Sequence, residues 1–428
     1  MSPKLIAYYT NWSQYARTCY PKNVPLDDTH MAVAYAFVNV TADAQVVTID
    51  SWADFDRPFN DATIGVTPLD STNDPAGTVH GAIGQFLKLR KQGKAFDFIL
   101  SLGGWSLSKY FSTALSTDAL RHTLATNVVA WYDKYPGLIT GIDFDVEYLT
   151  GKGTNYGLDG NIVAAGDDTR FCQFLDILRP MLPSDVKISM CCSPVPEKID
   201  WDVNAVVSRL DELRVMLYDL RSGSFPGDEI CSHQSNLYPS SYAPLSGDGI
   251  VQFLLSKGVP PKKIFIGVAM YSRGYANAEG LGLYGKGASP DDGWEPGIVD
   301  YKALPVSGAT EYWDDVCKAP YSYDSVRKVF NTYDDYRSAA EKAKYVCKKG
   351  LGGIIAWSID GDHPVNHQRS ITKAILDVYN NPPLEESTDT HTSVKDVVKK
   401  SSSYTMLIIG IIITLLAVLA GVMWYKRR

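Results

Sequence analysis

Short apolar runs rich in Val, Ile and aromatic residues recur along most of the chain. They are continuously apolar rather than alternating with polar positions, which predicts strands of a parallel sheet buried on both faces. The predicted strands are residues 5–10, 32–38, 96–102, 138–146, 187–192, 213–218, 264–271 and 353–357.

Segments with helical periodicity lie between many of these runs, at residues 81–92, 118–134, 169–181, 249–257 and 333–348. Repeated strand and helix units of this kind predict an α/β fold, a (β/α)8 TIM barrel over residues 1–379. A doubly wound sheet is the alternative, but no glycine-rich phosphate loop follows the first strand.

The interval between the seventh and eighth predicted strands is much longer than one helix requires. Its excess, about residues 274–331, is rich in Gly, Tyr, Trp and Pro. We expect a small α+β insertion there, on the loop side of the barrel, where barrel enzymes place their active sites.

The end of the chain differs in composition from the rest. Residues 380–405 read as a polar linker, and residues 406–424 form an uncharged run of nineteen, followed by a basic tail at 425–428. At ~1.5 Å per residue this run spans a ~30 Å hydrocarbon layer, which predicts a transmembrane helix and a single-pass protein anchored in the lipid bilayer. Lysine and arginine residues flank the run on both sides, so the side of the membrane that the barrel faces stays open.

Charge and cysteine content exclude several classes of function. The net charge of -7 provides no basic surface, so nucleic acid is not an expected partner. The seven cysteines form no CxxC pair, which argues against a zinc site or a disulfide framework. The N-terminus lacks the apolar region of a signal peptide, so we expect the chain to start in the cytosol.

Three acids on one predicted strand form the candidate catalytic group. Asp143, Asp145 and Glu147 lie at i, i+2 and i+4, so their side chains share one face, in the barrel interior near its upper rim. Such a set cannot be fully ionised away from water, and one member with a raised pKa suits a general acid. A solvated strand edge and a cation site are the alternatives that the spacing leaves open.

Three motifs together resemble the family 18 chitinases. They are Ser101-Leu-Gly-Gly104, Gly141-Ile-Asp-Phe-Asp-Val-Glu147 and Met216-Leu-Tyr-Asp219, which match the family hallmarks SxGG, DxxDxDxE and MxYD in the expected order. The similarity covers about residues 4–378 and is greatest to the bacterial and insect-virus chitinase A subgroup. It departs from the family at Thr140, where the hallmark has its first Asp.

The resemblance implies a role for each residue of the catalytic group. Family 18 enzymes use the 2-acetamido group of the substrate as the nucleophile, so one protein acid suffices. Glu147 would protonate the glycosidic oxygen, Asp145 would orient the acetamido N–H, and Tyr218 would bind the acetamido oxygen. Asp143 would exchange a proton with Asp145 and thereby tune Glu147.

The same resemblance implies a chitin or chito-oligosaccharide groove and hydrolysis of β-1,4-linked N-acetylglucosamine polymers, without metal or cofactor. We expect Gly103 and Gly104 to provide backbone clearance for the sugar. Two other functions stay open, a chitin-binding lectin and an endo-acting glycosidase that cuts the chitobiose core of N-glycans. The implied groove residues are Tyr8, Trp12, Tyr15, Arg17, Trp105, Tyr148, Met216, Asp219, Tyr271, Arg273, Trp294, Glu295 and Trp357.

Overall fold

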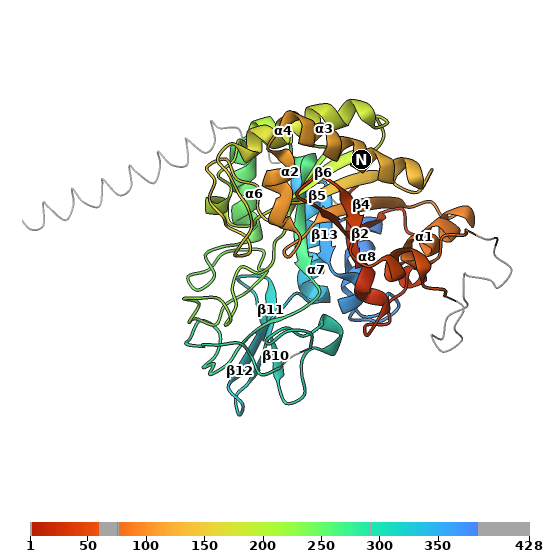
Figure 1. Ribbon diagram of the computed structural model, residues 1–428. Coiled ribbons are helices and arrows are strands. Elements are labelled where there is room, and N and C mark those ends of the chain that lie inside the picture. Colours follow the sequence, from red (N-terminus) through yellow and green to blue (C-terminus); the bar gives the residue numbers. More distant parts are fainter. Residues whose placement is uncertain (1, 60–74, 76, 292, 384–428) are drawn as a thin grey trace, which may run out of the picture. The chain divides into compact units, whose positions relative to one another are not determined.

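A closed barrel of parallel strands forms the centre of the computed structural model, which describes residues 2–59, 75, 77–291 and 293–383 (Figure 1). The strands run in the order β1-β13-β8-β7-β6-β5-β4-β2, and pairing of β1 with β2 closes the barrel. They are β1 (Lys4–Thr10), β2 (Met31–Val40), β4 (Asp97–Gly103), β5 (Gly141–Asp145), β6 (Lys187–Cys192), β7 (Glu212–Val215), β8 (Ile264–Ala269) and β13 (Gly353–Trp357). The predicted (β/α)8 barrel is therefore confirmed.

Three strands, β5, β7 and β8, are shorter than their apolar runs, and β8 ends at Ala269 rather than at Tyr271. The strand β5 begins at Gly141, which pairs with Ile99 of β4, and the residues before it connect the preceding helix to the sheet. The strand β7 ends at Val215, so Met216 and Tyr218 belong to the loop that follows it. A short strand β3 (Val46–Thr48) pairs antiparallel with the end of β2.

Helices cover the outside of the barrel, and the principal core lies between them and the strands. Side chains fix several helix starts, as where Thr117 accepts the N–H of Leu120 at the start of α3 and Asp335 accepts two N–H groups at the start of α7. The helices are α1 (Gly81–Lys91), α2 (Phe111–Leu115), α3 (Asp118–Lys134), α4 (Asp167–Leu178), α5 (Val203–Val207), α6 (Gly247–Ser256), α7 (Tyr336–Lys349) and α8 (Ile371–Asn380).

A second, antiparallel sheet lies between β8 and α7, where the insertion was expected (Figure 1). Its order is β10 (Thr310–Asp314), β11 (Ala319–Asp324), β12 (Val329–Thr332) and β9 (Arg273–Tyr275). The α+β expectation for this segment is wrong, because its described residues contain no α-helix. Alternating exposed and half-buried positions along β10 and a polar, aromatic-rich β11 favour strands over helices here.

The barrel and the second sheet belong to one compact unit that ends at Pro383. The predicted linker at 380–405 lies outside the described residues except for its first four positions, and the predicted transmembrane helix at 406–424 lies wholly outside them. Within the part of the chain that the structure describes, no helix has the length and apolar character needed to cross a bilayer.

Candidate active site

The three predicted acids meet at the C-terminal end of β5. Asp143 and Asp145 lie on the strand, whereas Glu147 lies in the turn that follows it, and all three side chains are buried. The turn is held by hydrogen bonds from the Glu147 N–H to Ser108 Oγ at 2.9 Å and from Asn161 Nδ2 to the Glu147 carbonyl at 3.1 Å. Glu147 is therefore fixed at the barrel rim although it is not part of the strand.

Burial raises the pKa of Glu147 to about 8, with a further contribution from the charge of Asp219, although Tyr148 and Lys198 oppose the shift. The pKa of Asp145 is also raised, by burial first and then by the charges of Glu147 and Asp143. These two carboxyls consequently carry protons at a pH where an ordinary carboxyl is ionised. The arrangement suits a general acid near neutral pH.

Asp145 has an oxygen that the protein does not satisfy. Its Oδ1 is buried and has no hydrogen-bond partner among the described residues. A buried polar atom without a partner is costly, so this oxygen is suited to receive an N–H group of a ligand. Tyr218, which is 8% exposed, lies in the loop after β7, and its ring packs edge-on against Tyr271 with centroids 6.2 Å apart.

Aromatic rings from three barrel strands and one loop form a platform inside the rim. Trp357 at the end of β13 stacks on Phe37, with ring centroids 5.4 Å apart, and contacts Tyr8 at 5.5 Å and Trp12 at 6.4 Å. Flat apolar faces of this kind stack on the C–H faces of sugar rings.

Two ion pairs fix polar side chains that were predicted from the sequence to line the groove. Asp219 accepts hydrogen bonds from Tyr271 Oη and from two guanidinium nitrogens of Arg273, each at 2.7 Å. Arg17 pairs with Asp300 and lies over the ring of Trp294, with 4.5 Å from the guanidinium carbon to the centroid.

The remaining groove candidates differ in exposure. Tyr15 and Trp105 are largely exposed, at 40% and 49%, while Met216 is buried beside Tyr218 in the interior cluster. Tyr148 is partly buried next to Glu147, and Glu295 is exposed in the loop that carries Trp294. Among the described residues, no hydrogen bond or ion pair joins Trp105 or Glu295 to the three acids.

Residues 4–362 match the sequence profile described as Glycosyl hydrolases family 18. The chain belongs to glycosyl hydrolases family 18.

Curated relatives of this family 18 chain come from fungi and insect viruses, among others. It is 32% identical to Endochitinase 1 of Metarhizium robertsii, over 83% of this chain and 80% of that protein. It is 26% identical to the chitinase of Autographa californica nuclear polyhedrosis virus, over 83% of this chain and 70% of that protein. Among solved structures, the catalytic domain of chitinase B from Arthrobacter TAD20 shares the fold, with a TM-score of 0.77 at 24% identity, covering 88% of this chain and 95% of that one.

The two glycines of the family's SxGG motif make room for protein atoms, and the clearance for a sugar that the sequence predicts stays a prediction. A Cβ on Gly103 would lie 2.3 Å from the carbonyl oxygen of Asp145, and one on Gly104 would lie 2.7 Å from the ring of Phe37. Both residues also have φ near +100°. The motif thus lets β4 pack directly against the catalytic strand and the aromatic platform.

Several residues around the acids were not anticipated from the sequence. Arg214 of β7 and Ser189 and Cys191 of β6 surround Asp143, and Lys198 lies near Glu147. Of these residues, only Arg214 could have been found from the sequence. It and Glu212 are charged residues, two positions apart, at an apolar run that predicts a buried strand.

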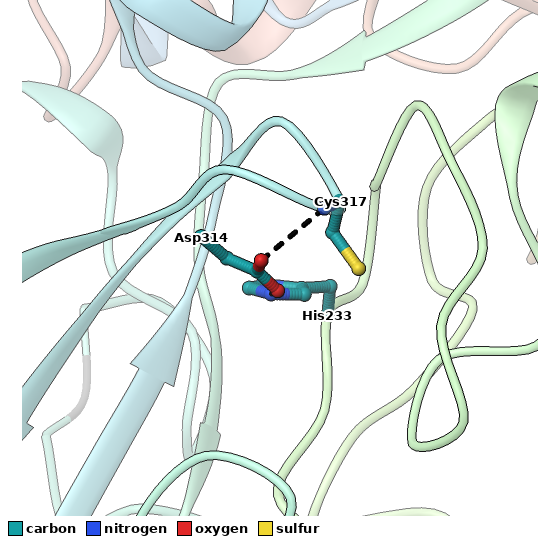
Figure 2. A group of neighbouring side chains, drawn as sticks. All are labelled: His233, Asp314 and Cys317. Atoms are coloured by element: carbon teal, nitrogen blue, oxygen red, sulfur yellow. Dashed lines mark hydrogen bonds and ion pairs between the residues drawn. The ribbon is translucent and has the colours of Figure 1, made fainter.

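One buried group, between the loop after β7 and the insertion, has the residue types of a metal site. His233, Asp314 and Cys317 offer ligand atoms within 4.8 Å of one another, and Figure 2 shows their side chains together. However, Asp314 Oδ2 accepts hydrogen bonds from His233 Nε2 at 2.9 Å and Tyr242 Oη at 2.6 Å, and its Oδ1 accepts two backbone N–H groups. The protein's own donors thus use the acceptor capacity of Asp314, and we interpret the group as a link between the loop after β7 and the β10–β11 turn.

Proposed function

We propose that this chain is a chitinase that hydrolyses β-1,4-linked N-acetylglucosamine polymers with retention of configuration. Membership of family 18 supports the reaction class, because this family uses the substrate's acetamido group as the nucleophile. The observation that carries the proposal is the buried Glu147, with a pKa of about 8, beside an Asp145 oxygen that has no partner among the described residues.

The proposed reaction divides its tasks between three side chains. Glu147 donates its proton to the leaving glycosidic oxygen while the acetamido carbonyl attacks the anomeric carbon, which gives an oxazolinium ion. Asp145 Oδ1 accepts the acetamido N–H, and Tyr218 donates its hydroxyl to the acetamido oxygen. Glu147, now a carboxylate, removes a proton from the water molecule that attacks the anomeric carbon and opens the oxazolinium ring.

The aromatic platform of Tyr8, Trp12, Phe37 and Trp357 provides the surface on which we place the sugar at the cleavage point. The ion-paired groups Asp219–Arg273 and Arg17–Asp300, with Trp294, would contact the hydroxyl rims of neighbouring sugars. The exposed rings of Tyr15 and Trp105 would extend the groove. A lectin without catalysis would need none of the pKa elevation found at Glu147.

The acid is tested by Glu147→Gln, which keeps the shape of the side chain but cannot donate a carboxylic proton. Turnover of colloidal chitin and of a chromogenic chito-oligosaccharide should fall by about 10²–10⁴-fold, while binding to chitin persists. The control is Glu341→Gln, which alters an acid that pairs with Lys344 on the outer helix α7 and should leave turnover unchanged. Full activity of Glu147→Gln would refute the assignment of the acid.

We also propose that residues 406–424 anchor the chain in a membrane. The support is the uncharged run of nineteen residues and the basic tail that follows it. The chain would then act as a tethered chitinase, and the compartment it faces remains a matter for experiment.

A further inference from the structure

A buried arginine lies below the catalytic acids, inside the barrel. Arg214 is 1% exposed, and its Nη1 lies 3.3 Å from Asp143 Oδ1. Its Nη2 donates to Glu212 Oε2 at 2.8 Å, and Glu212 also pairs with Lys187 at 2.8 Å. Glu212 and Arg214 project to the same side of β7 because they are two residues apart, so this strand brings a cation to the base of the acid group.

The groups that face Asp143 come from four neighbouring strands. Its carboxylate is completely buried and receives hydrogen bonds or a cation on both oxygens. The partners are Tyr8 Oη at 2.9 Å, Ser101 Oγ at 2.8 Å, Ser189 Oγ at 2.6 Å, Cys191 Sγ at 3.6 Å and Arg214 Nη1 at 3.3 Å. Since Arg214 can only donate, and three hydroxyl groups that can donate lie within hydrogen-bond distance of the two oxygens, this environment favours a carboxylate.

Asp145, the next acid along the strand, has the opposite surroundings. One of its oxygens is buried without a partner among the described residues. Burial and then the charges of Glu147 and Asp143 raise its pKa. Arg214 itself stays charged, because Asp143 and Glu212 outweigh the burial that would lower its pKa.

We propose that Arg214 is a positioning residue that keeps Asp143 a carboxylate throughout the reaction, so that the proton of this acid pair stays on Asp145, next to Glu147. This inference rests on the proposed chitinase function. The resemblance implies that Asp143 and Asp145 exchange a proton. Under this proposal they do not: Asp143 stays negatively charged, and Asp145 holds the proton of the pair. Arg214 acts through Asp143 and does not touch the substrate.

The test is the pH dependence of kcat/KM on a chromogenic chito-oligosaccharide. Removing a cation near a group of carboxyls favours their protonated forms, so Arg214→Met should move both limbs of the profile to higher pH by about one unit. Arg214→Lys restores a cation and should return the limbs close to those of the wild type. Lys187→Met is the matched control, because it removes a cation that pairs with Glu212 but is 42% exposed and has no contact with Asp143 among the described residues, and it should leave the limbs in place.

A second variant separates charge from folding. Arg214→Met leaves Glu212 with one fewer partner, whereas Glu212→Gln combined with Arg214→Met removes both charges together and should fold. Its shift should have the same direction but be smaller, because the lost anion offsets part of the lost cation. Limbs that stay in place while kcat falls equally at every pH would show a purely structural arginine and overturn the proposal. A wild-type chain without activity would overturn the chitinase function itself, which is a distinguishable result.

Discussion

In the proposed reaction Glu147 must carry a proton, and the charges that set its pKa can be altered one at a time. Because the general acid works in its protonated form and its pKa is about 8, kcat/KM should fall as the pH rises above about 8. The charge of Asp219 contributes to this high pKa, so Asp219→Asn should make Glu147 easier to ionise and move the alkaline limb to lower pH. This is the opposite direction to that expected for Arg214→Met.

The measurement is a pH profile of kcat/KM for each variant, with Asp118→Asn as a control. Asp118 is an exposed acid at the start of α3 whose removal should leave the limb unchanged. An alkaline limb that does not move in Asp219→Asn would contradict the electrostatic coupling to Glu147.

At the scale of single residues, the sequence identified the acids because strand alternation places Asp143 and Asp145 on one face. It could not identify Ser189 or Cys191 as neighbours of Asp143, because strand register, not sequence spacing, sets Asp143 opposite Ser189. Thr140 illustrates the same limit. Its hydroxyl accepts the N–H of Phe98 at 2.9 Å, and it lines a cavity of about 350 Å³ at the lower end of the barrel, away from the catalytic acids.

Among the elements, α7 is tied to the barrel by a completely buried ion pair. Lys342 Nζ donates to Asp334 Oδ2 and Ser235 Oγ at 2.7 Å each, and to the carbonyl of Gly267 on β8 at 3.1 Å. Gly267 in turn leaves room for Tyr218, because a Cβ there would lie 2.9 Å from the tyrosine ring. The helix thus supports the strand against which a proposed catalytic side chain packs.

Lys342→Met should lower the free energy of unfolding by about 3–5 kcal/mol, because it leaves the buried Asp334 carboxylate without its cation. Chemical denaturation measures this loss. Lys344→Met, two residues along the same helix, removes an exposed pair with Glu341 and should change stability by about 0.5 kcal/mol or less. Equal stability of the two variants would contradict the structural role of Lys342.

The sequence predicted the elements better than their ends. All eight barrel strands were expected from continuous apolar runs, but the predicted ranges for β5, β7 and β8 were too long, since pairing with neighbours rather than hydrophobicity decides where a strand stops. A second sheet lies in the segment where the insertion was expected, but the described residues of that segment contain no α-helix. Its short polar and aromatic segments form strands only because they pair with one another across β10, β11, β12 and β9.

For the whole molecule, the testable question is whether the tail holds the chain at a membrane. The full chain should remain in the membrane pellet after extraction with alkaline carbonate, whereas a chain ending at Pro383, the limit of the compact unit, should be released and retain turnover. Ile412→Arg with Leu416→Arg is the matched control, since each charge costs about 2.5–3.5 kcal/mol at the centre of a membrane helix and should release the full chain. Recovery of the unmodified full chain in the supernatant would refute the anchor.

In the proposed site, Asp145 Oδ1, which has no partner among the described residues, faces the group on the second carbon of the sugar. Cellulose and fully deacetylated chitosan share the chain geometry of chitin but carry no amide N–H at the second carbon. Cellulose would place a hydroxyl and chitosan an amine against this oxygen, but neither supplies the acetamido carbonyl that acts as the nucleophile in the proposed reaction, so both should turn over far more slowly than chitin. Cleavage of a partly acetylated polymer would therefore depend on whether the sugar bound at the cleavage point carries an acetyl group.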